Sequence, residues 1–247
     1  MDSSEFQFQF IHLNCTNSTN IYAFELLRQK SIVEGTVITT DYQEKGKGQQ
    51  GQKWESERVK NLQFSLVMFP KLEVDKQFKL SQLVAISLKE WLDTMAVADA
   101  KIKWPNDILV NGKKIAGVLI ENSIQGREIS HSVIGIGINV NQEVFSNFER
   151  PATSLKLELD RSCDRQFLLD EFLQVFRTRY IQFMVGQLNL NQLYLNSLFG
   201  FGKPQHYKDA EGDFLGVILG VLPLGKLEVN RNGKLKSYDL KELRFLD

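Results

Sequence analysis

A polar, glycine-rich segment, DYQEKGKGQQGQKWESER (residues 41–58), has residue types suited to holding an anion. Glycines let backbone N–H groups come close to phosphate or carboxylate oxygens, and Lys45, Lys47 and Lys53 add positive charge. Trp54 can stack on a planar base. The pattern therefore fits a loop that closes over an anionic ligand. Composition alone slightly favours a solvated surface loop, because residues 41–60 carry five basic and four acidic side chains.

Two familiar phosphate-binding motifs do not explain this segment. Gly46, Gly48 and Gly51 formally satisfy GxGxxG, but that motif requires a helix to start directly afterwards. The residues that follow, QKWESER, are polar and lead into another strand pattern. A P-loop also fails, because Gly51 precedes Gln52-Lys53 where that motif has Lys and then Ser or Thr.

A second segment, KIKWPNDILVNGKKIAGVLIEN (residues 101–122), places charge at a rigid corner. Strand alternation puts Lys101 and Lys103 on one face, and Pro105 then ends regular pairing. A lysine there can hold two anions together, and Asp107 beside it can position a metal or a hydrogen-bond donor. The alternative is a hairpin whose charged edge prevents aggregation. In a third segment, GIGIN (135–139), the glycines can admit a ligand to the backbone or allow a tight strand crossing.

The periodicity predicts the elements that must position these segments. Apolar spacing predicts a helix over 18–30, with Ser18 and Thr19 as possible caps, and another over 78–95. Strands are predicted at 36–41, 62–69 and 128–140, and the Asn111-Gly112 pair between two apolar runs predicts a hairpin. Two further helices are predicted over 166–185 and 189–199. Their expected core residues are Phe167, Phe172, Val175, Phe176, Tyr180 and Phe183.

Composition changes at FGFGKP (199–204), where short strands separated by turn residues begin. These predict a small all-β unit of barrel size. The predicted fold class is α+β: a mixed or antiparallel sheet with packed helices over 1–199, followed by a small β domain over 200–247.

The overall composition limits the possible functions. Thirty basic and thirty acidic residues give zero net charge, which disfavours a nucleic-acid-binding role. Cys15 and Cys163 are far apart, and no histidine has a partner at metal-ligand spacing, so no disulfide framework or zinc site is expected. The N-terminus lacks signal-peptide features, and the longest apolar run, 214–224, is too short to span a bilayer. We therefore expect a cytoplasmic protein without membrane or nucleic-acid partners.

Taken together, the motifs resemble those of biotin–protein ligases. KWPNDI (103–108) followed by KKIAGVLIEN (113–122) resembles the family signature, and GKGQQGQKW (46–54) resembles its adenylate loop. SerThrAsn at 18–20 and Gln43 stand where the family has biotin-contacting residues, and GIGIN resembles a third family element. The similarity extends over nearly the whole chain, and the C-terminal β unit resembles the family's SH3-like domain.

This resemblance implies a two-step reaction. The carboxylate of biotin attacks the α-phosphate of ATP, giving biotinyl-5′-AMP and pyrophosphate. A lysine on the biotin carboxyl carrier domain of a carboxylase then attacks the mixed anhydride. Mg²⁺ is expected to accompany ATP, with Asp107 as its candidate ligand. Only about seventeen residues precede Ser18, too few for the winged helix of the family's repressor members, so we expect a ligase alone.

The resemblance also assigns roles to residues. Lys103 would bridge the biotin carboxyl group and the phosphates in both steps. The expected biotin-binding residues are Ser18, Thr19, Asn20, Gln43, Gly46, Lys47, Gly48, Lys103, Gly117 and Gly135. The expected ATP- or adenylate-binding residues are Lys47, Gln49, Trp54, Lys103, Asn106, Asn139 and Arg244.

The adenylate loop departs from the family pattern, and two other functions are compatible with the sequence. The family commonly has arginines at the positions of Lys47 and Gln49, so Lys47 lacks the bidentate fork and Gln49 lacks the charge. We therefore predict that this loop retains the adenylate less through charge and more through hydrogen bonding and contact with Trp54. The alternatives are a lipoate–protein ligase or octanoyl transferase of similar fold, and a non-catalytic protein that senses biotin. An exposed sheet edge could also support a homodimer.

Overall fold

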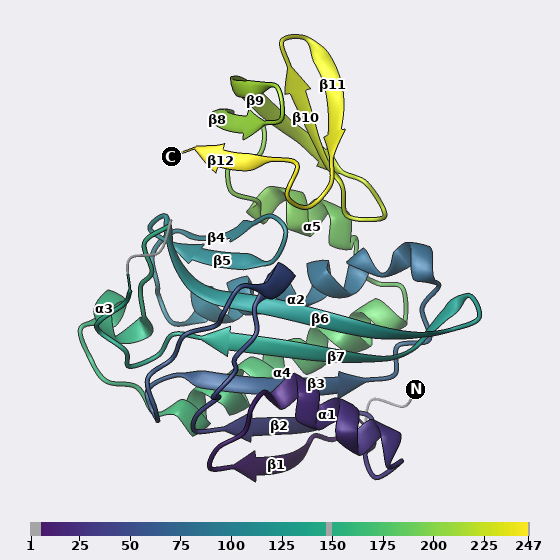
Figure 1. Ribbon diagram of the computed structural model, residues 1–247, viewed down its shortest axis with the longest axis vertical. Helices are drawn as coiled ribbons and strands as arrows, with labels where there is room; N and C mark the ends of the chain where they lie inside the picture. Colours follow the sequence, from purple (N-terminus) through teal and green to yellow (C-terminus); the bar gives the residue numbers. More distant parts are fainter. Residues whose placement is uncertain (1–5, 147–149, 247) are drawn as a thin grey trace.

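The computed structural model describes residues 6–146 and 150–246 and contains two β-sheets (Figure 1). The larger is a seven-stranded mixed sheet in the order β1-β2-β3-β7-β6-β5-β4. Only the β1–β2 pair is parallel, and every other neighbouring pair is antiparallel. The strands are β1 (Gln9–Leu13), β2 (Thr36–Thr40), β3 (Leu62–Met68), β4 (Ala100–Lys103), β5 (Asp107–Val110), β6 (Lys113–Gln125) and β7 (Glu128–Ile138). The predicted α+β class is therefore confirmed.

Helices cover both faces of this sheet. Helix α1 (Thr19–Arg28) packs on β2, β3 and β7 at one face, while α2 (Phe78–Thr94) and α4 (Arg165–Met184) lie on the other. The short α3 (Leu155–Leu159) follows the loop after β7, and α5 (Leu190–Ser197) packs against α2. No helix within the described ranges is long and apolar enough to cross a membrane.

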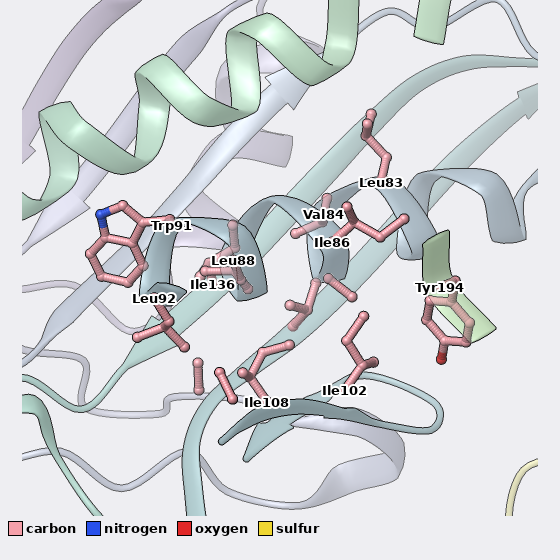
Figure 2. Close-up of a cluster of buried hydrophobic side chains, with 14 of the residues drawn as sticks. Leu83, Val84, Ile86, Leu88, Trp91, Leu92, Ile102, Ile108, Ile136 and Tyr194 are labelled. Carbon is pink, nitrogen blue, oxygen red and sulfur yellow. The ribbon is translucent and has the colours of Figure 1, made fainter. Parts of the chain in front are cut away.

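The main core forms between α2 and the sheet because α2 is apolar on the sides it turns toward β4–β7. Figure 2 shows side chains of α2 converging on Ile102 of β4, Ile108 of β5 and Ile136 of β7. Leu83, Leu88 and Leu92 are completely buried there. Burying each such side chain contributes about 1.5–3 kcal/mol to folding, so this layer holds the β4–β5 corner, and Lys103 with it, in place.

The C-terminal region forms a five-stranded antiparallel sheet, consistent with the expected SH3-like unit. Its order is β11-β10-β9-β8-β12. The strands are β8 (Pro204–Asp209), β9 (Gly212–Val221), β10 (Leu227–Arg231), β11 (Lys234–Tyr238) and β12 (Arg244–Leu246). Trp104 Nε1 donates a hydrogen bond of 2.8 Å to the Gly225 carbonyl, and the buried core continues from one unit into the other. The expected boundary at 199/200 falls in the α5–β8 connection and stays a prediction.

The structure differs from the sequence-based elements in three places. Strand β1 and helix α3 were not predicted, and the run 101–110 is a hairpin, β4–β5, with its turn at 104–106. Phe167, predicted to be core, is 61% exposed. It precedes Phe176 by nine residues, which at about 100° per residue places it on the opposite side of α4. The Asn111-Gly112 hairpin is confirmed, and both residues have positive φ.

Candidate active site

A cavity of about 320 Å³ lies between the start of α1, the loop 43–54 and the middle of β6 and β7. It gathers residues from distant parts of the sequence because α1 lies across the sheet next to β3 and β7. Most of the predicted site residues line it: Ser18, Thr19, Asn20, Gln43, Lys47, Gly48, Gln49, Trp54, Lys103, Asn106, Asp107, Gly117 and Gly135.

A second cavity of about 700 Å³ adjoins the first and reaches the C-terminal sheet. Gln49, Trp54, Lys103 and Asp107 line both cavities, while Asn139 and Arg244 line only the second. Sequence reasoning missed much of this second wall, namely Lys114, Phe145, Arg150, Lys241, Leu243 and Phe245. Most of these residues lie outside the recognised motifs. Lys114 lies inside the KKIAG segment and could have been found there.

The glycine-rich loop is a small hairpin without a following helix. Trp54 N donates to Gly46 O at 3.0 Å, Gly48 N donates to Gln52 O at 2.7 Å, and a 3₁₀ turn, η1 (Gln49–Gly51), forms the tip. A Cβ on Gly46 would lie 2.7 Å from Trp54 O, so this predicted residue lies at the base of the hairpin. The rejection of a dinucleotide-binding motif is therefore confirmed.

Trp54 rests on a flat part of the sheet formed by two paired glycines. Gly117 of β6 and Gly137 of β7 are direct cross-strand partners. A Cβ on Gly137 would lie 2.3 Å from Trp54 Cε2, and one on Gly117 would lie 3.1 Å from Cζ3. The missing side chains therefore provide the space in which the indole lies, between the two cavities.

The floor of the first cavity is a network of buried polar side chains. Thr19 N donates to Gln43 Oε1 at 2.8 Å, and Gln43 Nε2 donates to Gln63 Oε1 at 3.1 Å. The Ser65 hydroxyl lies 2.7 Å from Thr19 Oγ1 and 2.6 Å from Asn20 Oδ1. Ser18 occupies the N-cap position of α1, as predicted, although its side chain makes no capping hydrogen bond.

Three charged side chains lie where the cavities meet. Lys103 Nζ is 4.8 Å from the ring centroid of Phe245, which packs against the lysine from the C-terminal sheet. Lys114 Nζ lies 2.7 Å from Asp107 Oδ1 and 5.7 Å from the centroid of the Trp54 ring. Two lysines at the junction of two cavities can hold two anionic groups close together.

The two predicted asparagines form hydrogen bonds within the protein. Asn106 Nδ2 donates to Val118 O at 2.5 Å, which ties the β4–β5 turn to β6. Asn139, which is 4% exposed, donates through Nδ2 to Thr153 O at 3.0 Å. These bonds hold the cavity walls in position, and each amide nitrogen donates to a main-chain oxygen.

A divalent metal has only limited protein ligands here. Among residues 6–146 and 150–246, no group of three or more His, Cys, Asp or Glu side chains could hold a metal. Asp107 is a single carboxylate that lines both cavities. Mg²⁺ is typically held by one or two carboxylates together with substrate phosphates, and Asp107 fits that limited role.

Comparison with known proteins agrees with this geometry. The family model described as "Biotin/lipoate A/B protein ligase family" matches residues 12–139. The bifunctional ligase/repressor BirA of Bacillus subtilis is 31% identical over 92% of this chain and 71% of its own length. The biotin–[acetyl-CoA-carboxylase] ligase of Paracoccus denitrificans is 26% identical over 86% of this chain and 90% of its own.

The fold agrees as well. A biotin protein ligase from Aquifex aeolicus, solved in complex with biotin and ATP, superposes with a TM-score of 0.78. It shares 26% identity, over 98% of this chain and 99% of that one. The motifs, the paired cavities and these matches lead to one conclusion: the chain belongs to the biotin/lipoate A/B protein ligase family.

Proposed function

We propose that this protein is a biotin–protein ligase that activates biotin with ATP and transfers it to a lysine of a partner protein. The observation that carries the proposal is the meeting of two cavities at Lys103. The first has a polar floor suited to a urea ring. The second is large enough for a nucleotide and lies beside Lys114, Arg150, Lys241 and Arg244.

The geometry suits the first reaction step. A carboxylate oxygen of biotin attacks the α-phosphorus of ATP, and the bond to the pyrophosphate oxygen breaks. Both reactants are anionic, so fixed positive charge must lower their repulsion. Lys103 at the junction is the candidate group, with Lys114 nearby. Asp107 would be the protein ligand of Mg²⁺, which neutralises phosphate charge when bound.

In the second step, an acceptor lysine attacks the acyl carbon and AMP leaves. The acceptor we propose is the biotin carboxyl carrier domain of a carboxylase. A relative supports this, since the Paracoccus denitrificans protein is named a biotin–[acetyl-CoA-carboxylase] ligase. We also propose a cytoplasmic enzyme that does not bind DNA, and a homodimer formed through an exposed sheet edge.

A lipoate ligase or octanoyl transferase is the second candidate, because the matching family model covers both activities. The cavity floor favours biotin. Buried hydrogen-bonding groups would be left without partners under an alkyl chain or a dithiolane ring, and each such group costs roughly 1–3 kcal/mol.

The test combines purified protein, ATP–Mg²⁺ and biotin with a carrier domain, and follows pyrophosphate release and acceptor mass. We expect a biotin-sized mass gain that Lys103→Ala abolishes. Lys101→Ala is the matched control, because Lys101 lies on the same face of β4 and pairs with the exposed Asp99. Preference for lipoate would overturn the biotin assignment, and biotin binding without pyrophosphate release would indicate a sensor.

A further inference from the structure

A chain of hydrogen bonds runs from Glu121, on β6, to the floor of the first cavity. Asn20 Nδ2 donates to Glu121 Oε2 at 2.7 Å, and Asn20 Oδ1 lies 2.6 Å from Ser65 Oγ. Ser65 Oγ lies in turn 2.7 Å from Thr19 Oγ1. Thr19, Asn20 and Ser65 are all at most 3% exposed, so water does not replace these contacts.

The Glu121 carboxylate at the end of this chain determines which group donates in each of its hydrogen bonds. A carboxylate can only accept, so the Asn20 amide must turn its NH₂ group toward Glu121 and its oxygen toward Ser65. An amide oxygen also only accepts, so the single Ser65 proton must point at Asn20. The single Thr19 proton then has two acceptors within the protein, Ser65 Oγ at 2.7 Å and Gln43 Oε1 at 3.3 Å, and goes to one of them. Thr19 Oγ1 is therefore left with lone pairs and acts as an acceptor toward the cavity.

A second set of hydrogen bonds orients the neighbouring side chain, that of Gln43. The backbone N–H of Thr19 can only donate, so Gln43 must face it with Oε1. Gln43 Nε2 then points at Gln63, which must present its own Oε1. Gln63 is 2% exposed, and its Nε2 has no hydrogen-bond partner. One N–H of Gln43 remains to act as a donor toward the cavity.

We propose that Glu121 and Gln63, which do not line the cavity, are positioning residues that make its floor selective for a cyclic urea. Glu121 makes Thr19 an acceptor, and Gln63 holds the Nε2 of Gln43 in the donor orientation that the Thr19 backbone N–H sets. A urea offers the complement, an N–H and a C=O on one rigid ring. This inference rests on the proposed function and adds residues that determine ligand specificity.

The test uses two substitutions at each positioning residue. Glu121→Met lets the Asn20 amide rotate and the chain reverse, while Glu121→Gln keeps an acceptor for Asn20. We expect Glu121→Met to raise the Kd and KM for biotin about tenfold, with kcat and the KM for ATP within about twofold. Glu121→Gln should stay near wild type. Gln63→Met and Gln63→Glu should show the same contrast.

A ligand analogue separates positioning from simple structural damage. In 2-iminobiotin, an N–H group replaces the urea oxygen, so it opposes the donor of Gln43. Gln63→Met should reduce the preference for biotin over this analogue, which a general loss of stability would not do. Gln125→Met, exposed on the same strand β6, is the control and should leave both affinities unchanged.

Two results would overturn the inference: Glu121→Met binding biotin as tightly as wild type, or Glu121→Gln losing as much affinity as Glu121→Met. In either case wild-type pyrophosphate release would still support the proposed function. Failure of the wild-type protein to bind biotin at all would instead refute the proposed function, and this inference with it.

Discussion

Single residues control how closely the adenylate loop approaches the sheet. Trp54 separates the two cavities and lies over Gly137, where even one methyl group would overlap the indole. The Trp54 Nε1 is buried without a hydrogen-bond partner, so the ring is held by van der Waals contact with the sheet and by the Lys114 ammonium group 5.7 Å from its centroid. The absence of a side chain at Gly137 is therefore a requirement of the site.

Gly137→Ala should displace Trp54 and weaken retention of the adenylate by about tenfold or more, because the new Cβ and the ring cannot occupy the same space. The release rate of biotinyl-5′-AMP measures this. A double-mutant cycle with Trp54→Ala supplies the control, since the alanine at 137 should have little further effect once the ring is gone. If the effects of Gly137→Ala and Trp54→Ala on the release rate were fully additive, this steric explanation would be wrong.

Gln49 is the residue through which charge can be restored to the loop. It lines both cavities and carries no charge. Gln49→Arg should slow adenylate release several-fold, because charge-assisted hydrogen bonds to phosphate are stronger than neutral ones. Gln125→Arg adds the same charge on the exposed end of β6 as a control. Unchanged release and affinity in Gln49→Arg would show that loop charge does not limit retention here.

At the scale of elements, the C-terminal sheet is held by an ion cluster around the buried Asp209 at the end of β8. The Asp209 side chain is 2% exposed, and its Oδ2 accepts from Arg231 at 2.5 Å, Lys236 at 3.0 Å and Tyr238 at 2.9 Å. Burial raises the pKa of Asp209, but the hydrogen bonds and the Arg231 charge outweigh it and lower the pKa to about 2. The folded state therefore favours the carboxylate.

This pKa predicts how stability depends on pH. The unfolded pKa of an aspartate is about 3.9, so the contribution of Asp209 is present above about pH 4 and is lost as the pH falls toward 2. Asp209→Asn should lower Tm by roughly 5 °C or more at pH 7, and the difference from wild type should shrink in acid. Asp213→Asn, at an exposed pair with Lys208, should change little. A Tm difference between Asp209→Asn and wild type that did not change with pH would exclude this explanation.

At the scale of the whole molecule, the second cavity exists only because the two sheets are held together. Its wall combines β4, β5 and residues after β7 with residues 240–246 of the C-terminal unit. The Trp104–Gly225 hydrogen bond crosses this junction, and Trp104 is 2% exposed. The position of the C-terminal unit should therefore affect nucleotide binding in the second cavity more than biotin binding in the first.

Trp104→Phe removes that bond and should raise the KM for ATP about three- to tenfold, while leaving the KM for biotin nearly unchanged. Steady-state kinetics with each substrate varied in turn provide the measurement. Trp91→Phe is the control, because Trp91 is buried in the core and its Nε1 has no partner. Equal changes in both KM values would contradict the separation of the two cavities.

The sequence alone determined the features that depend on neighbouring residues. The Asn111-Gly112 turn follows from residues that tolerate positive φ. Alternation along β4 predicts the face on which Lys103 lies. The polar residues after Gly51 predict that no helix begins there. The motifs also indicated the family, because they occur in order along the chain. Phe167 shows the limit of this reasoning, because apolar content without the helical phase does not tell which side faces the core.

Only the tertiary structure decided which distant residues share a face. Glu121 and Asn20 are separated by 101 positions, and Gln63 and Ser65 lie in a strand that carries no motif. Sheet register brings Ser65 opposite Gly135 and Gln63 opposite Gly137, and a shift by one residue would turn these side chains into the opposite layer. The polar floor and the second cavity depend on that register and on the docking of the C-terminal sheet, which no local pattern specifies.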